Sequence, residues 1–204
     1  MENKTQMVTS KQLKSNSDRF YLLWHKKLLE SVKIVNPRIH RILTGKHDLK
    51  KYSKPFGSSY IYGIVGAGKS VRAMWMMMEC FRLKYIYSQC PKTYEFITCD
   101  ELLMEIKKTF NSSKVSEFDI IEHYQNIDVL VIDDIGVMST TDWSYKTLYV
   151  IINHRYSHYK TTIYTSNKSL DELSDLLQDD RITDRIQHDC EDRIYQFKNK
   201  SRRK

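Results

Sequence analysis

Eight consecutive residues have the types and spacing of a phosphate-binding loop. Residues Gly63–Ser70 read G-I-V-G-A-G-K-S and match the pattern G-x-x-x-x-G-K-[ST] in full. Glycines let the backbone wrap closely enough to point several N–H groups at a triphosphate. In such a loop the lysine reaches the β- and γ-phosphates, the serine hydroxyl binds Mg²⁺, and the following helix adds its positive end. The predicted nucleotide-contacting residues are Gly63, Gly66, Ala67, Gly68, Lys69, Ser70 and Val71.

A pair of carboxylates ends an apolar run further along the chain. The run Val129–Asp134 reads V-L-V-I-D-D and is typical of a buried strand whose acidic end meets a ligand. We expect Asp133 to hold Mg²⁺, through water, and Asp134 to orient or deprotonate an attacking water. Many strands end at an acidic turn, so the separation of Asp133 from Lys69, with 63 residues between them, is what favours this interpretation.

Polar side chains at two later places could complete the same site. Asn167 ends the next apolar strand and could hydrogen-bond the γ-phosphate or the water, or it could instead cap the following helix. Arg181 and Arg185 lie four residues apart on one face of a predicted helix. They could be surface residues in salt bridges, or arginine fingers that reach the nucleotide of a neighbouring subunit.

The elements that must position these residues alternate between strand and helix from Ser59 onward. Near-continuous apolar strands separated by helices predict an α/β fold, a three-layer P-loop core with a parallel sheet covered on both faces. The expected strands cover residues 59–62, 94–98, 128–133, 161–165 and 193–197, and the expected helices cover residues 71–87, 100–109, 115–125, 143–159, 169–177 and 179–188.

The net charge of +8 is unevenly distributed over the 204 residues. Residues 1–58 hold 13 Lys and Arg against 4 Asp and Glu, whereas residues 59–204 hold 20 against 21. Basic ends around a nucleotide-binding body suggest contact with nucleic acid or another anionic partner, although they could merely aid solubility. We expect a basic extension over residues 1–50 with an amphipathic helix at 18–35, an ATPase domain over 51–197, and a basic tail over 198–204.

No apolar run approaches the length of a membrane span, and the polar N-terminus is unlike a secretory signal. The four cysteines show no C-x-x-C pairing, which favours free thiols in a reducing compartment. The sequence therefore predicts a cytoplasmic protein without a membrane partner.

The order and spacing of these motifs resemble the DnaC/DnaI-type helicase loaders and the related IstB-like ATPases, a branch of the AAA+ superfamily. The resemblance covers about residues 50–190. The matching segments are Tyr52–Gly57, Gly63–Ser70, Asp128–Gly136, Arg155-Tyr156, Thr162–Leu173 and Asp180–Ile186.

The resemblance implies an ATPase with Mg²⁺ that acts as a slow switch. It implies that Asn167 is the sensor 1 residue, that Arg185 is the arginine finger in trans, and that Arg181 is a second arginine at the nucleotide interface. It also implies that Arg155 stands at the subunit interface. Asp134 departs from the Glu of many AAA+ proteins, and the chain ends too soon after the arginines for the usual helical lid, as in the loaders.

The family's partners are a hexameric replicative helicase, single-stranded DNA and further copies of the loader, assembled alone or on the helicase. Our candidate for helicase docking is the amphipathic segment 18–35. For single-stranded DNA the resemblance points to the region between the second and third strands, which includes Lys107, Lys108 and Lys114. A solvated charged helix face is the alternative for these lysines.

Three other functions remain open at the level of sequence. An IstB-like helper ATPase would deliver a transposase to duplex DNA with the same core. A small P-loop nucleotide kinase would also fit a phosphate loop in about 200 residues, although the order of the Asp, Asn and Arg motifs suits it poorly. A non-hydrolysing adaptor would retain nucleotide for structure alone.

Overall fold

The computed structural model of the protein describes residues 57–86, 93–111, 115–137 and 141–198. The expected extension over residues 1–50 with its amphipathic helix lies outside the described residues, as does the basic tail after residue 198. Within the described ranges, no helix is long and apolar enough to cross a membrane.

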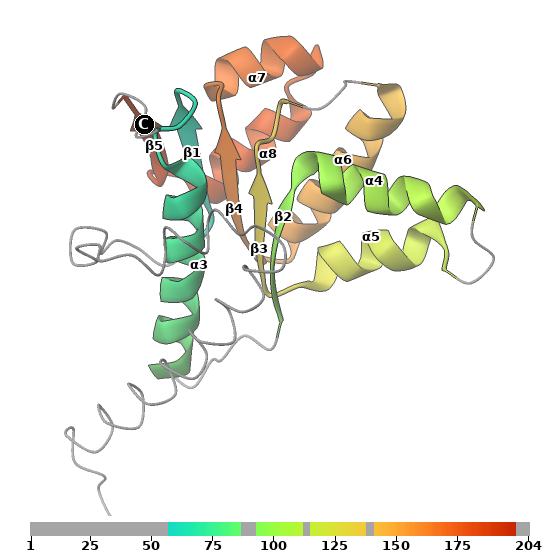
Figure 1. Ribbon diagram of the computed structural model, residues 1–204, viewed down its shortest axis with the longest axis horizontal. Coiled ribbons are helices and arrows are strands. Elements are labelled where there is room, and N and C mark those ends of the chain that lie inside the picture. Colours follow the sequence, from blue (N-terminus) through green and yellow to red (C-terminus); the bar gives the residue numbers. More distant parts are fainter. Residues whose placement is uncertain (1–56, 87–92, 112–114, 138–140, 199–204) are drawn as a thin grey trace, which may run out of the picture.

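Strands and helices alternate along the described chain, as Figure 1 shows. The strands are β1 (Ser59–Gly63), β2 (Tyr94–Thr98), β3 (Val129–Asp133), β4 (Thr161–Ser166) and β5 (Ile194–Phe197). The helices are α3 (Lys69–Ile86), α4 (Cys99–Lys108), α5 (Glu117–Asn126), α6 (Asp142–Ser157), α7 (Leu170–Leu177) and α8 (Arg181–Cys190), with a 3₁₀ turn at Thr109–Asn111 after α4.

The five strands form one parallel sheet in the order β2-β3-β4-β1-β5. The register pairs Val131 of β3 with Ile163 of β4, and Tyr62 near the end of β1 with Ser166 of β4. Because all strands run the same way, the segments that follow β1, β3 and β4 meet at one edge of the sheet. In open α/β sheets this carboxyl edge is where ligands bind.

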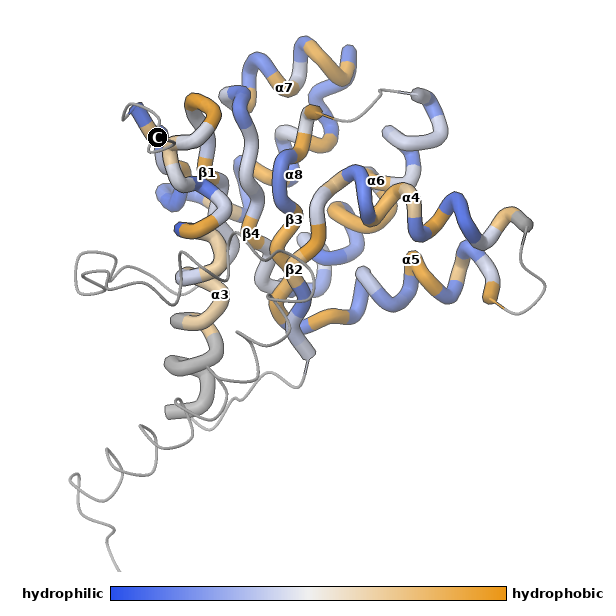
Figure 2. Tube along the Cα trace, in the orientation of Figure 1, coloured by the Kyte–Doolittle hydropathy of each residue, from blue (hydrophilic) through white to orange (hydrophobic). Residues whose placement is uncertain are grey.

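Apolar side chains pack on both faces of the sheet, which is why the strands read as nearly continuous hydrophobic runs. On one face, Val131 and Ile163 pack against the methionines of α3, among them Met74. On the other face, Leu130 and Tyr164 belong to the core that α6 and α8 complete. Figure 2 shows a strongly hydrophobic run in β3, whereas the helices alternate between hydrophobic and hydrophilic residues.

The α/β class and the parallel sheet predicted from the sequence are confirmed. All five strands and six helices expected in the described residues are present, and most boundaries agree within two residues. The helix expected at 143–159 is observed as α6, whose start is set by a capping box in which Thr141 and Ser144 each bond to the other's backbone N–H.

Candidate nucleotide site

The loop between β1 and α3 has the backbone that its glycines permit. Gly63, Gly66 and Gly68 have φ of 136°, 80° and 97°, a region that favours glycine. Gly63 has a second requirement, because an added Cβ would lie 2.1 Å from the carbonyl oxygen of Phe197 in β5. Nothing lies within 4 Å of a Cβ added to Gly68, so its glycine is needed for the conformation alone.

Lys69 lies at the first position of α3 and is buried, with 5% of its surface exposed. Its Nζ donates to the carbonyl oxygens of Gly63 at 3.0 Å and Ile64 at 3.1 Å. It also donates to Oδ1 of Asn167 at 2.7 Å, across 98 residues of sequence. The structure therefore brings the loop lysine and the predicted sensor asparagine into direct contact.

Asp133 is the last residue of β3 and is buried, 4% exposed. Burial, together with the neighbouring Asp134 carboxylate, raises the pKa of Asp133 to about 6, against the opposing effect of hydrogen bonds from Thr165 and Ser70. The Thr165 hydroxyl donates to Oδ1 of Asp133 at 2.6 Å. The two residues predicted to hold Mg²⁺, Ser70 and Asp133, thus share one hydrogen-bonded cluster.

This donor set fits Mg²⁺. Carboxylate and hydroxyl oxygens are the hard ligands that this ion takes from proteins, usually with water and phosphate oxygens. A buried carboxylate with a raised pKa also gains stability when a cation arrives beside it.

Asp134 follows directly in a tight turn and has φ of 56°, in the left-handed region. Aspartate tolerates this conformation better than most residues. Its backbone N–H donates to the Thr165 hydroxyl at 2.9 Å, and its side chain is half-buried at the same edge as Asp133. This places two successive carboxylates at the end of β3, one buried and one half-buried.

Within the described residues, the contacts of the two arginines of α8 lie outside this cluster. Arg181 is paired with Asp179 at 2.7 Å and stacks over the ring of Tyr149 at 5.1 Å. Arg185 donates to Asn153 of α6 at 3.1 Å and is paired with Asp184. In the single chain, Arg181 is therefore paired with a residue just before α8, Arg185 with a residue of α8, and both lie against α6.

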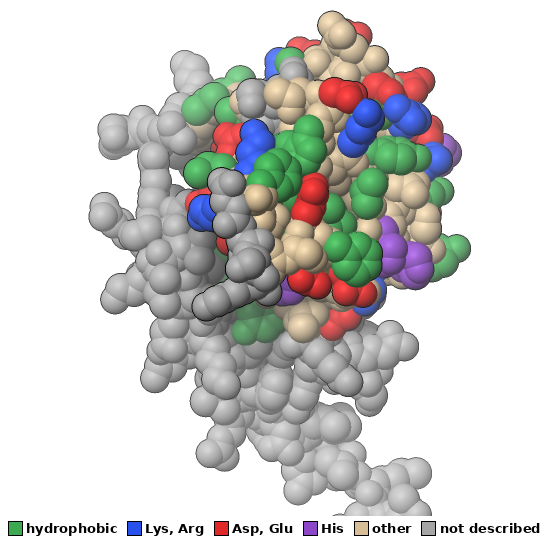
Figure 3. Space-filling model, turned by 90° about the vertical axis from the view of Figure 1, so that its right-hand side faces the viewer, with side chains coloured by type: hydrophobic (Ala, Val, Ile, Leu, Met, Phe, Trp, Pro, Cys, Tyr) green, Lys and Arg blue, Asp and Glu red, His purple; other side chains and the backbone are tan. Residues whose placement is uncertain are grey.

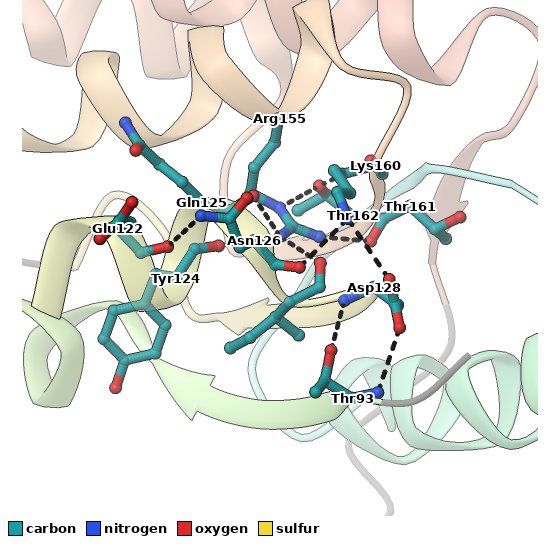
Figure 4. Close-up of polar contacts among 11 residues, drawn as sticks. Thr93, Glu122, Tyr124, Gln125, Asn126, Asp128, Arg155, Lys160, Thr161 and Thr162 are labelled. Carbon is teal, nitrogen blue, oxygen red and sulfur yellow. Dashed lines mark hydrogen bonds and ion pairs between the residues drawn. The ribbon is translucent and has the colours of Figure 1, made fainter. Parts of the chain in front are cut away.

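The expectation that Arg155 stands at a subunit interface is wrong. Arg155 is fully buried, and its guanidinium donates to the carbonyl oxygens of Tyr124, Ile127 and Thr161 at 2.7–2.8 Å and to the Thr162 hydroxyl at 2.9 Å (Figure 4). Burial lowers the pKa of Arg155 to about 10, so it stays charged at neutral pH. Its role is to join the end of α5 to the start of β4, at the edge of the sheet away from Lys69.

The predicted DNA-contacting lysines are only partly within the described residues. Lys107 and Lys108 are exposed on α4, and Lys107 lies 5.0 Å above the ring of Trp143, whereas Lys114 lies outside the described residues. Figure 3 shows the side of the molecule that carries the ends of α4 and α5, where basic side chains form separate small groups among acidic and hydrophobic ones. Among the described side chains on that face, no continuous basic stripe is visible.

Sequence reasoning missed Thr165, which contacts both acidic residues. The signal was present, since Thr165, Ser166 and Asn167 form a run of polar residues at the end of an apolar strand. Of this run, the sequence predicts a role for Asn167 alone, because the partners of a buried hydroxyl can be identified only in the folded structure.

The parallel sheet and this cluster at its carboxyl edge define a P-loop nucleotide-binding domain of the AAA+ class. The family model described as "IstB-like ATP binding protein" matches residues 60–204. The chain therefore belongs to the family of IstB-like ATP-binding proteins, and the resemblance inferred from its motifs is confirmed.

Individual relatives agree with this family. The replicative helicase loader DnaC of Escherichia coli (strain K12) is 30% identical over 95 residues, which are 47% of this chain and 38% of DnaC. The chromosomal replication initiator protein DnaA of Flavobacterium psychrophilum is 29% identical over 130 residues, 62% of this chain and 26% of that protein. The matched region thus spans well under half of the length of these relatives.

Solved structures show the same fold. The crystal structure of the DnaC helicase loader aligns with a TM-score of 0.55 and 23% identity, over 78% of this chain and 85% of that one. The crystal structure of DnaI aligns with a TM-score of 0.57 and 18% identity, over 89% and 84%.

Proposed function

We propose that this protein is an ATP-dependent DNA replication factor that loads a hexameric replicative helicase onto single-stranded DNA. The observation that carries the proposal is the contact of Lys69 with Asn167, because it joins a triphosphate-binding lysine to a side chain that can sense the γ-phosphate. The similarity to the replicative helicase loader DnaC supports the choice of partner and a cytoplasmic site of action.

The residues of the site suit a slow ATPase that serves as a switch. Lys69 would exchange the carbonyls of Gly63 and Ile64 for the β- and γ-phosphates. Asn167 accepts from Lys69 through Oδ1, and its Nδ2–H would donate to the γ-phosphate or to the attacking water. Ser70 and Asp133 would hold Mg²⁺, which offsets the charge of the phosphates. Asp134 would orient the water and accept its proton.

The first test is ATP binding by the wild type and by Lys69→Ala, measured by titration calorimetry with Mg²⁺. We expect the variant to bind at least about tenfold more weakly, because it lacks the charge-assisted hydrogen bonds to the phosphates. Lys160→Ala is the matched control, since Lys160 lies at the opposite edge of the sheet and pairs with Asp128. Equally weak binding by wild type and Lys69→Ala would contradict the proposal.

The second test is helicase loading. We expect the wild type to co-purify with a hexameric replicative helicase and to increase the amount of helicase bound to circular single-stranded DNA when ATP is present. Lys69→Ala should lose the dependence on ATP. A wild type that neither binds such helicases nor changes their DNA occupancy would overturn this assignment of the partner.

Delivery of a transposase to DNA is a second candidate, and the match to the IstB-like family model favours it. The two functions differ in their DNA and in their protein partner. Binding to duplex DNA with recruitment of a transposase, and no effect on a helicase, would support this alternative.

A further inference from the structure

A single hydroxyl in the fourth strand contacts the acidic end of the third strand twice. Thr165 lies in β4 and is fully buried. Its Oγ1 donates to Oδ1 of Asp133 at 2.6 Å and accepts the backbone N–H of Asp134 at 2.9 Å. Its carbonyl oxygen accepts the backbone N–H of Ile135 at 2.8 Å. Thr165 therefore bonds to three successive residues at the end of the neighbouring strand.

The direction of these bonds is fixed by chemistry. A backbone N–H can only donate, so the hydroxyl must accept from Asp134 and has its single proton left for Asp133. That bond engages one oxygen of the Asp133 carboxylate and limits its rotation. The second oxygen of Asp133 is then the one that can meet a cation beside Ser70.

The backbone of Asp134 also depends on such contacts. A residue other than glycine at φ of 56° is held in a sparsely populated conformation, and this needs support from its surroundings. Thr165 supplies two acceptors to this turn, for the N–H groups of Asp134 and Ile135. The direction in which the Asp134 side chain leaves the sheet is set by that turn.

The neighbouring residues of the same segment fix the rest of the site. The Ser166 hydroxyl donates to the carbonyl oxygen of Ile135 at 2.6 Å and accepts the N–H of Lys168 at 3.1 Å. Asn167 lies between these residues and contacts Lys69 at 2.7 Å. The end of β4 thus links the loop lysine on one side to both carboxylates on the other.

We propose that Thr165 is a positioning residue of the nucleotide site, which orients the Asp133 carboxylate to receive Mg²⁺ with the nucleotide and fixes the turn at Asp134. The inference rests on the proposed binding of ATP and Mg²⁺ and adds a residue to which the motifs assign no role. Thr165 acts through its neighbours and need not touch the nucleotide.

Three variants test it. Thr165→Val has nearly the same shape but lacks the hydroxyl, whereas Thr165→Ser keeps the hydroxyl. Thr162→Val is the matched control, because Thr162 is a fully buried threonine of the same strand whose hydroxyl bonds to Arg155 at the opposite end. It removes a comparable buried hydrogen bond without touching the carboxylates.

The measurement is the affinity for ATP by titration calorimetry, with Mg²⁺ and with EDTA. We expect the wild type to bind ATP more tightly with Mg²⁺ than with EDTA, and the gain is the ratio of these two affinities. In Thr165→Val this ratio should be roughly tenfold or more smaller, as is typical when a partner of a metal ligand is removed. Thr165→Ser should retain most of the gain. Thr162→Val should melt at a lower temperature yet keep the full gain.

The outcomes separate the two proposals. A Mg²⁺ gain that Thr165→Val retains, or that Thr162→Val loses equally, would overturn the role of Thr165 alone. A wild type that binds ATP no better with Mg²⁺ would overturn the proposed function and this inference with it.

A measurement on the wild type alone covers the case in which Thr165→Val does not fold. The amide proton of Asp134 should be protected from hydrogen exchange without any ligand, because Thr165 already accepts it. Exchange as fast as in an open loop would contradict the proposal.

Discussion

The Asp133 carboxylate is held in a state that is unfavourable without a cation. Its pKa is raised to about 6, mainly by burial, above the ordinary value of 3.8. Between these two pH values the folded protein binds a proton more readily than the unfolded chain does, so stability falls as the pH rises through this window. Above pH 6 the full cost of the buried charge is present.

Asp133→Asn should therefore stabilise the protein at pH 7.5 when nucleotide and Mg²⁺ are absent. We expect the free energy of unfolding to rise by about 1–3 kcal/mol, since two pKa units correspond to about 3 kcal/mol at most. Urea unfolding at pH 7.5 and pH 5 checks this, and the difference between the variant and the wild type should shrink at pH 5.

Asp171→Asn, at an exposed position of α7, is the control and should leave stability unchanged within about 0.5 kcal/mol. If Asp133→Asn were less stable than the wild type at both pH values, the burial argument would be wrong.

Asp134 gives a second prediction at this scale, which concerns catalysis. Asn is well tolerated in the left-handed region that Asp134 occupies, so Asp134→Asn should keep the fold and the affinity for ATP. An amide cannot accept the proton of the attacking water, and we expect hydrolysis to fall by about a hundredfold or more. Titration calorimetry measures the affinity for ATP, and a single-turnover assay measures the rate of hydrolysis. Unchanged hydrolysis would remove Asp134 from the proposed mechanism.

At the scale of elements, Arg155 links three parts of the fold. It lies on α6 and bonds to carbonyl oxygens at the end of α5 and at the start of β4. Its acceptors are backbone carbonyls and a hydroxyl, arranged around a planar cation that can donate in several directions at once (Figure 4).

Arg155→Met should destabilise the protein by about 3 kcal/mol or more, because several buried carbonyls lose their donors together. Arg155→Lys should recover only part of this loss, since one ammonium cannot span the same acceptors. Urea unfolding is the measurement. Lys146→Met is the control, because Lys146 is exposed and pairs with the exposed Asp142 in α6, and it should cost less than about 0.5 kcal/mol. An effect of Arg155→Met as small as that of the control would refute the linking role.

The contrast between Arg155 and the helix that carries it shows what the sequence could predict. Apolar periodicity was enough to place α6 and β4 within two residues, because burial of a hydrophobic stripe is the main force that sets them. The burial of an arginine depends on acceptors from α5, which is distant in sequence, and no local pattern carries that information. The role of Thr165 could not be predicted for the same reason. The roles of Lys69 and Asn167 could be predicted, because one belongs to the phosphate-loop motif and the other follows the end of an apolar strand.

At the scale of the whole molecule, the arginines of α8 pose the main question. Arg181 and Arg185 form salt bridges with Asp179 and Asp184 of their own chain. Their guanidinium groups lie over the aromatic rings of Tyr149 and Tyr156, which belong to α6. Within the described residues, these contacts of Arg181 and Arg185 lie outside the cluster around Lys69. A role in hydrolysis would therefore require the nucleotide of a second subunit, for which the partly exposed guanidinium of Arg185 would exchange its partners.

Mixing two inactive variants tests whether the site is shared in this way. Lys69→Ala removes the phosphate-binding lysine and leaves Arg185 intact, whereas Arg185→Ala does the reverse. We expect each variant alone to hydrolyse ATP at least about tenfold more slowly than the wild type under conditions of assembly. In an equimolar random mixture, on the order of a quarter of the interfaces would combine an intact lysine with an intact arginine. The ATPase activity of the mixture should therefore rise to about a quarter of the wild-type activity.

The shape of the recovery distinguishes a shared site from an effect on folding. Recovery that grows with total protein concentration would mean that the two halves come from different subunits, because dilution separates them. Lys146→Ala mixed with Lys69→Ala should give the activity of simple dilution, since Lys146 is exposed and pairs with Asp142 of its own helix. Full activity of Arg185→Ala alone, or a mixture no more active than its components, would show that the nucleotide is hydrolysed without Arg185 from a neighbour. Full activity of Arg185→Ala alone would leave that arginine with its contacts to Asn153 and Asp184.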